Sequence, residues 1–323
     1  MDLFDKLAFK GPLFYGVFSM TVYILIVFVI LSDPTFKSTF YNLLVIGFIM
    51  NLLTYLNSFI TCRIPQNTGR NGTFSTFFRS HDRNQTAPWF PVRISHTLHY
   101  NFAYSQYFHS LLICLDRLLA LLFLSGRTKY RKRFICLSIF VLFILPAGFN
   151  YPVLTGTSFY IYNEHGDFFY IDSTYSRRQM YEVLGPFLGS IASASVLLIL
   201  FAIYQMRKVN SERCNQLKSK MLQMAMCTLT IEMFLVVLSG LNWYLWVMSS
   251  IEENPVLTER VFSLIPFASD ALTLTPPYLI LVFNKTVREK CVAKLFRLEK
   301  KQVNRMLCDT VGVAVVERIE SVY

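Results

Sequence analysis

The chain has 323 residues, of which 54% are hydrophobic and only 16% are charged. Soluble domains carry about 25% charged residues, so this composition excludes an ordinary soluble enzyme, and the 30 Phe and 18 Tyr exclude a disordered chain. The net charge of +11 does not indicate a nucleic-acid partner, because the basic residues lie in short stretches between long apolar segments.

Seven long apolar stretches follow one another along the chain. A hydrocarbon core about 30 Å thick requires roughly 20 helical residues, and a helix satisfies its backbone hydrogen bonds internally. We therefore predict an all-α membrane protein, a seven-transmembrane helix bundle within residues 1–283, followed by a tail at residues 284–323. The predicted spans lie near Pro12–Leu31, Tyr41–Thr61, Thr97–Leu124, Phe134–Leu154, Val183–Tyr204, Met221–Met248 and Arg260–Phe283.

The first apolar stretch is too long for the core of a cleavable signal peptide, and no small-residue cleavage site follows it. We expect it to remain as a signal anchor that forms the first helix. The alternative is an uncleaved targeting segment in front of a six-helix protein.

The distribution of Lys and Arg predicts the orientation of the bundle. With the N-terminus outside, roughly two-thirds of the 31 basic residues fall on the cytoplasmic side, in agreement with the positive-inside rule. Two glycosylation sequons, at Asn71 and Asn84, lie in the long loop after the second helix and support the same orientation. We therefore predict a glycoprotein with an extracellular N-terminus and a cytoplasmic C-terminus. A third sequon, at Asn284, would face the cytosol and stay unmodified.

The cysteines predict no extracellular disulfide. Of the seven Cys residues, only Cys62 lies near the predicted outer surface, and the loop Thr155–Glu182 contains none. Cys62 is therefore interpreted as a lone thiol without an obvious partner.

The tail begins with an amphipathic stretch. Val287, Cys291, Leu295 and Leu298 recur at helical spacing among Lys and Arg residues, which predicts an eighth helix along the inner leaflet, in contact with membrane lipid. Cys291 is a candidate for palmitoylation because juxtamembrane cysteines carry this modification. An unmodified thiol is the alternative.

Three carboxylates fall within predicted spans, where a charge normally faces the interior of the bundle. Asp270 and Asn51 lie at similar predicted depth, which suggests a shared buried polar node with water or a small cation. The alternative for Asp270 is a hydrogen bond to a neighbouring helix. Glu232, near the middle of the sixth span, is expected to be a packing hydrogen-bond acceptor, or else a ligand counter-ion or proton site.

The third carboxylate, Asp116, precedes Arg117 at the cytoplasmic end of the third span. An adjacent acid–base pair there can act as a latch, in which the Asp holds the Arg in one state and releases it to a protein partner in another. The alternative is a topological anchor whose Arg extends to the lipid headgroups.

A ligand is expected among the outer halves of helices three, five, six and seven, where aromatic and polar side chains gather. The candidate pocket residues are His99, Tyr104, Tyr107, Trp243 and Tyr244. For Trp243 and Trp246, interfacial anchoring is favoured over a pocket role, because Trp is enriched at membrane–water interfaces. No clear third ligand accompanies the His residues of the third span, so no metal is predicted. No catalytic or cofactor-binding motif appears either, so no enzymatic activity and no cofactor are predicted.

These features together resemble a nematode serpentine receptor of the gamma class or a close relative in the same superfamily. The resemblance is carried by the second helix, Tyr41–Arg63, by Asp116-Arg117, and by the seventh helix, Asp270–Arg288, in which an acid is followed by Pro and then Val-Arg. Asn51 departs from the Asp that many members carry, and a Pro often found after the third helix is missing from Leu122–Tyr130.

The resemblance implies a chemosensory G-protein-coupled receptor in the plasma membrane, with sensory cilia as the expected location. It implies a small-molecule ligand and a heterotrimeric G protein as partners. The alternatives are a membrane transporter or ion channel with Glu232 and Asp270 on its path, or a non-signalling membrane adaptor. Against a transporter, the sequence lacks the paired Gly/Pro-broken segments typical of inverted repeats.

Overall fold

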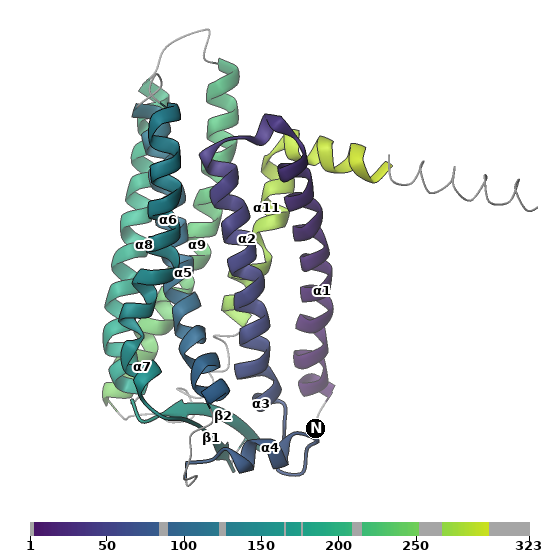
Figure 1. The fold of residues 1–323 in the computed structure, drawn as a ribbon, viewed down its shortest axis with the longest axis vertical. Helices are drawn as coiled ribbons and strands as arrows, with labels where there is room; N and C mark the ends of the chain where they lie inside the picture. The colour runs from purple at the N-terminus through teal and green to yellow at the C-terminus, as the bar shows by residue number, and fades with distance from the viewer. Residues whose placement is uncertain are drawn as a thin grey trace, which may run out of the picture.

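The computed structural model describes residues 3–83, 90–122, 127–164, 166–175, 177–208, 215–251 and 267–296. Long helices pack side by side into a bundle, and a two-stranded hairpin lies across one end (Figure 1). We call this end, which carries the hairpin at Ser158–Ser173, the hairpin end. The other end, where residues 285–296 turn sideways away from the bundle, is called the tail end.

The central helix of the bundle is α5 (Phe90–Leu122), which packs against α2, α6, α8 and α9. At one edge, α1 contacts α2 and α11. The other components of the bundle are α1 (Leu3–Ser32), α2 (Thr39–Ser58), α6 (Arg127–Phe149), α8 (Arg177–Lys208), α9 (Asn215–Ile251), residues 267–274 and α11 (Pro276–Phe283).

Within the described residues, five helical segments are long and apolar enough to cross a membrane, and they match five of the seven predicted spans. They are Leu13–Ser32, Thr39–Gln66, Lys132–Phe149, Glu182–Gln205 and Ala225–Leu245.

The remaining two predicted spans have different properties. The 33 residues of α5 extend about 50 Å, which is long enough to cross a membrane. Because of its polar side chains, however, α5 is not among the five strongly apolar segments. Phe267–Phe283 is apolar but shorter, and its helix is interrupted at Thr275, just before Pro276 and Pro277. The third and seventh spans therefore stay predictions.

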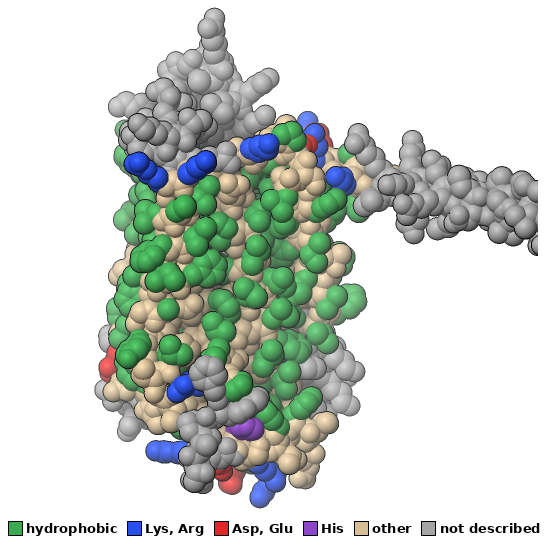
Figure 2. Space-filling model, in the orientation of Figure 1, with side chains coloured by type: hydrophobic (Ala, Val, Ile, Leu, Met, Phe, Trp, Pro, Cys, Tyr) green, Lys and Arg blue, Asp and Glu red, His purple; other side chains and the backbone are tan. Residues whose placement is uncertain are grey.

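Apolar side chains cover the side of the bundle that Figure 2 shows, and Lys and Arg side chains gather near its two ends. The share of buried residues is only 17% in Lys132–Phe149 of α6, against 56% in Thr39–Gln66. Because both segments are strongly apolar, this difference identifies α6 as an outer helix whose side chains suit contact with lipid.

Irregular turns mark both ends of α2. At the tail end, the 3-10 turn η1 (Pro34–Phe36) begins at Asp33, whose side chain accepts a hydrogen bond from the Thr35 amide at 3.0 Å. At the hairpin end, α2 continues into the π-helical turn η2 (Phe59–Arg63) and the short α3 (Ile64–Gln66). A π-helical turn inserts an extra residue and changes the direction of the side chains that follow, and here it buries Arg63.

The hairpin end is closed by a small layer of its own. Strand β1 (Ser158–Asn163) pairs antiparallel with β2 (Phe168–Ser173), and Ser158 lies opposite Ser173. The short helices α4 (Ser75–Ser80) and α7 (Tyr151–Thr155) lie beside them. An apolar cluster joins this layer to α5, and its buried members are Phe78, Val92, Tyr160, Phe169 and Ile171.

The hairpin turn is also tied to the preceding loop. Asp167, at a left-handed φ of 49°, accepts hydrogen bonds from the Tyr162 hydroxyl at 2.6 Å and from the Arg70 amide at 2.7 Å. These two hydrogen bonds hold the pKa of Asp167 below its ordinary value. The cysteines that the structure describes are all free thiols, so apolar packing and hydrogen bonds hold the hairpin.

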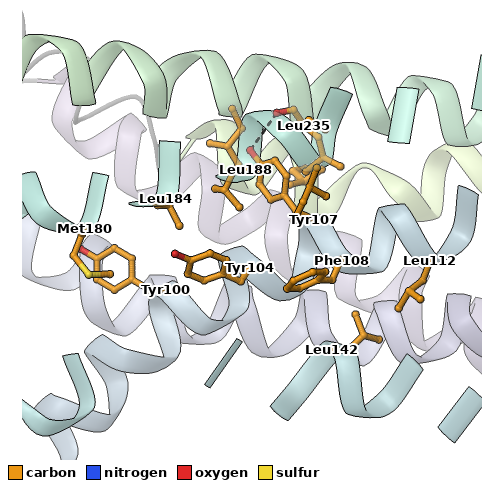
Figure 3. Close-up of a cluster of buried hydrophobic side chains, with 14 of the residues drawn as sticks. Tyr100, Tyr104, Tyr107, Phe108, Leu112, Leu142, Met180, Leu184, Leu188 and Leu235 are labelled. Atoms are coloured by element: carbon orange, nitrogen blue, oxygen red, sulfur yellow. Dashed lines mark hydrogen bonds between the residues drawn. The ribbon is translucent and has the colours of Figure 1, made fainter. Parts of the chain in front are cut away.

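The largest buried apolar cluster lies around α5, α8 and α9 (Figure 3). Tyr100, Tyr104 and Phe108 follow one another along α5 at a spacing of four residues, which places them on one face of the helix. On the side of α5 that meets α2, close approach depends on Gly47, where an added Cβ would overlap the imidazole of His109.

Candidate functional site

A cavity of about 80 Å³ lies at the hairpin end among α2, α5, α8 and α9. A water in the liquid occupies about 30 Å³, so the cavity has room for about three waters or for a molecule of about three or four heavy atoms. Ile171 of β2 belongs to the lining, so the hairpin contributes to its cover.

The wall of the cavity combines apolar and polar groups. Its apolar part includes Tyr100, Phe102, Leu184, Leu188 and Leu238. Its polar part includes Ser58, Cys62, Gln66, His96, His99 and Gln106. A partly open, mostly apolar pocket with a few polar groups has the properties of a small-molecule site.

Two of the five predicted pocket residues line this cavity, namely His99 and Tyr107. The Tyr107 hydroxyl donates a hydrogen bond to the Leu235 carbonyl of α9 at 3.2 Å, which fixes the ring between α5 and α9 (Figure 3). Tyr104, Trp243 and Tyr244 are not part of the lining. Tyr104 instead stacks on Phe149 of α6, and the Trp243 side chain is 48% exposed on the outside of α9. This exposure fits the interfacial anchoring favoured for Trp243.

Cys62 has a partner that the sequence did not reveal. Its Sγ lies 3.9 Å from His99 Nδ1 and 3.6 Å from the Thr61 hydroxyl. Cys62 is a free thiol, as predicted, and its neighbour is a histidine. His99 lies on another helix, 37 residues further along the chain, so no local sequence signal connects the two side chains.

Next to the cavity, Asp270 forms a buried ion pair with Arg63. The Arg63 guanidinium also lies over the Phe267 ring, 5.1 Å from its centroid. The predicted shared node of Asp270 and Asn51 is therefore revised, because the direct partner of Asp270 is the Arg at the end of the second span. Arg63 is the last residue of the π-helical turn η2, and its side chain is buried.

Asn51 takes part in a separate network. Its Nδ2 donates to the Tyr23 hydroxyl at 3.1 Å, and Gln106 Nε2 donates to its Oδ1 at 3.4 Å. The Tyr23 hydroxyl in turn donates to the Thr273 carbonyl. Asn51 and Asp270 are thus connected indirectly, because both networks end on residues 267–274.

Glu232 of α9 is fully buried against α5. Its Oε1 accepts hydrogen bonds from the Ser110 hydroxyl and from the Cys114 thiol, the latter at 3.3 Å. Its other oxygen, Oε2, has no hydrogen-bond partner among the residues that the structure describes. These contacts match the packing role predicted for Glu232, and they join the middle of α9 to α5.

At the tail end, Arg117 and Asp116 form an ion pair at 2.6 Å, and both side chains are largely buried. The guanidinium of Arg117 lies over the Phe40 ring at the start of α2, 4.0 Å from the ring centroid. The structure therefore shows the state in which Asp116 holds Arg117, and Arg117 packs against α2 in this state.

The tail helix, residues 285–296, packs on the bundle with its first turns. Val287 and Cys291 are buried in a cluster with residues of α1 and α2, whereas Leu295 is 50% exposed. The Cys291 thiol is covered in this arrangement, so acylation would require the helix to move away. Leu298 and the rest of the tail from residue 297 lie outside the described residues.

Of the two predicted glycosylation sites, one lies in the described part of the chain. Asn71 is exposed in the loop between α3 and α4, at the hairpin end. Asn84 lies outside the described residues. In the described part of the chain, no group of three or more His, Cys, Asp or Glu side chains is arranged to hold a metal ion.

The apolar helical bundle, with five helices in its described part that are long and apolar enough to cross a membrane, has the character of a multi-pass membrane protein. The sequence model of the Srg family chemoreceptors matches residues 9–291. This match covers most of the chain, which therefore belongs to the Srg chemoreceptor family, as the resemblance to gamma-class serpentine receptors predicted. The chain is 23% identical over 279 residues to serpentine receptor class gamma-31 of Caenorhabditis elegans, and this alignment covers 85% of the chain and 88% of that relative.

Proposed function

We propose that the protein is a G-protein-coupled chemosensory receptor that binds a small molecule in the cavity at the hairpin end and activates a heterotrimeric G protein at the tail end. The observation that carries the proposal is the cavity at the hairpin end, because helices α2, α5, α8 and α9 all contribute to it. Membership of a chemoreceptor family supports the same function.

The proposed topology has seven membrane-spanning helices, with the hairpin end outside the cell and the tail end in the cytosol. The excess of Lys and Arg in the loops of the tail end supports this orientation. The exposure of Asn71 at the hairpin end is compatible with glycosylation there. The proposed location is the plasma membrane, in particular that of sensory cilia.

In the proposed mechanism, the held Asp116–Arg117 pair belongs to the resting state. A ligand shifts the receptor toward the active state only if it binds that state more tightly. Glu232 and Tyr107 connect α9 to α5, so a change in the cavity wall reaches both helices. Release of Arg117 from Asp116 and Phe40 would then present its guanidinium to the G protein.

The test is a G-protein biosensor assay in cells that express the full chain, with and without chemical extracts. Arg117→Ala is expected to abolish the stimulated signal at equal surface expression. Arg133→Ala is the matched control, because Arg133 is an exposed basic residue at the same end of the bundle. Equal stimulated signalling in the wild type and in Arg117→Ala would contradict the proposal.

The transporter alternative has less support, because its two carboxylates are held separately, Glu232 by Ser110 and Asp270 by Arg63. A G-protein-independent solute flux that disappears in Glu232→Gln would favour that alternative.

A further inference from the structure

The cavity brings a nucleophile and a base together. The Cys62 thiol comes from the π-helical turn after α2, and His99 Nδ1 comes from α5. Both line the cavity, and Cys62 is a free thiol that is only partly covered. A thiol beside an imidazole loses its proton more readily to that base, and the thiolate is the reactive form.

A second observation in the same wall points to a ligand. Ser58 lies four residues before Cys62, is 3% exposed and lines the cavity. Its hydroxyl has no hydrogen-bond partner among the described residues, whereas the Thr54 and Thr61 hydroxyls donate to the backbone carbonyls of Met50 and Asn57. A buried donor left without an acceptor is costly, and a bound polar atom would satisfy it.

We propose that this cavity binds a small α,β-unsaturated carbonyl compound covalently and reversibly, with Cys62 as nucleophile, His99 as base and Ser58 as hydrogen-bond donor to the carbonyl oxygen. The inference rests on the proposed function and deepens it, because it names the ligand class of the receptor cavity. The apolar wall and the volume of about 80 Å³ suit a molecule of about three or four heavy atoms.

The addition is balanced without an oxidant or a reductant. The imidazole tautomer that carries its proton on Nε2 leaves Nδ1 free to take the proton from the Cys62 thiol. A bond then forms between Sγ and the β-carbon, and the electron pair of the carbon–carbon double bond moves toward the carbonyl oxygen, where the Ser58 hydroxyl donates. The proton held by His99 passes to the α-carbon. The reverse sequence, with His99 removing that proton, releases the compound and restores the thiol.

A disulfide or a metal site at Cys62 fits the described residues less well. Cys62 is the only described cysteine in the cavity wall, so no disulfide partner lies within it. No set of three metal ligands forms around it in the described part of the chain.

The experiment treats membranes that contain the full chain with acrolein and measures the rate of adduct formation at each cysteine by peptide mass spectrometry. The reference is Cys62 of the same chain unfolded in denaturant, where His99 no longer lies beside the thiol. We expect Cys62 in the folded chain to react at least about tenfold faster than in the unfolded chain, since a positioned base accelerates proton transfer by this much or more.

Variants separate the roles of the three residues. His99→Gln is expected to slow the reaction of Cys62 at least about tenfold. Ser58→Ala is expected to slow it about fivefold, the value of one hydrogen bond. His81→Gln is the control, because His81 lies at the end of α4, outside the cavity lining, and its loss should leave the rate unchanged.

Equal rates at Cys62 in the folded and in the unfolded chain, or a Cys62 rate that His99→Gln leaves unchanged, would overturn the inference. Protection of Cys62 from alkylation by Zn²⁺, with no acrolein adduct, would overturn it in favour of a metal site. Selective labelling without an Arg117-dependent signal would uphold the site and contradict the receptor mechanism. Arg117-dependent signalling by other compounds, without selective labelling, would overturn the ligand class and leave the receptor mechanism intact.

Discussion

Two ion pairs connect the last part of the described chain to the first two helices, and they differ in their surroundings. At the hairpin end, the side chains of Arg63 and Asp270 are 3% and 10% exposed. At the tail end, Lys290 Nζ lies 2.7 Å from Asp33 Oδ2, and these side chains are 48% and 19% exposed.

The difference shows how burial changes the role of the same chemical contact. A charge left alone in the protein interior has neither water nor a partner, so breaking a buried pair is strongly destabilising. Water replaces the partner in an exposed pair, so its loss matters little. We infer that Arg63–Asp270 fixes the position of residues 267–274, whereas Asp33–Lys290 only adjusts the tail helix.

The largest expected effect follows from removing one member of the buried pair. Asp270→Ala leaves the Arg63 guanidinium without that carboxylate and should destabilise the protein by about 3–5 kcal/mol. We expect little protein at the cell surface and a large fall in Tm in detergent. Asp33→Ala, which breaks the exposed pair, is the control and should reach the surface normally.

A double variant tests whether the unpaired charge of Arg63 causes this loss of stability. Arg63→Met combined with Asp270→Leu removes both charges and should recover much of the lost Tm, because neither charge then stays buried alone. A double variant as unstable as Asp270→Ala would mean that packing at this position, and not the unpaired charge, causes the loss.

A smaller effect is expected where two helices touch closely without any ion pair. Gly47→Leu forces its side chain against His109 and should destabilise the α2–α5 contact by about 1–3 kcal/mol, measured as a fall in Tm. Gly148→Leu on α6 is the control, because a Cβ at Gly148 would have no heavy-atom neighbour within 4 Å. An equal fall in Tm for the two substitutions would contradict the close approach of α2 and α5 at Gly47.

A third effect concerns the held state of Arg117 at the tail end. Phe40→Leu removes the aromatic ring beneath the guanidinium, a contact worth about 1 kcal/mol, and should raise ligand-independent signalling up to about fivefold. Phe140→Leu on the outside of α6 is the control and should not change the basal signal. A lower basal signal in Phe40→Leu would indicate that the ring supports the active state.

The smallest expected effect is a pH dependence of the exposed pair. Hydrogen bonds from Lys290 and Thr35 hold the pKa of Asp33 below its ordinary value of 3.8. Because this carboxyl binds a proton less readily in the folded state than in the unfolded state, its contribution is present above about pH 4 and is lost as the pH falls below that. Comparing the Tm of the wild type with that of Asp33→Asn should therefore show a small gap at neutral pH that closes in acid. A gap that widens in acid would contradict this assignment.

The sequence by itself determined the class and the family of the protein. Apolar length is a local property, and α1, α2, α6, α8 and α9 match the predicted spans because a bilayer requires about 20 apolar residues in succession. The acid followed by Pro and Val-Arg at Asp270–Arg288, and the Asp116-Arg117 step, carried enough of the family pattern for the family to be recognised.

Only the tertiary structure decided which polar side chains meet. Asp270 pairs with Arg63 across 207 positions of the chain, and Cys62 faces His99 because the turn η2 changes the direction of its side chain. The exposure of Trp243 likewise depends on the rotation of α9 against α8. Helix periodicity predicts which residues share a face, but the packing of helices against one another decides where that face points.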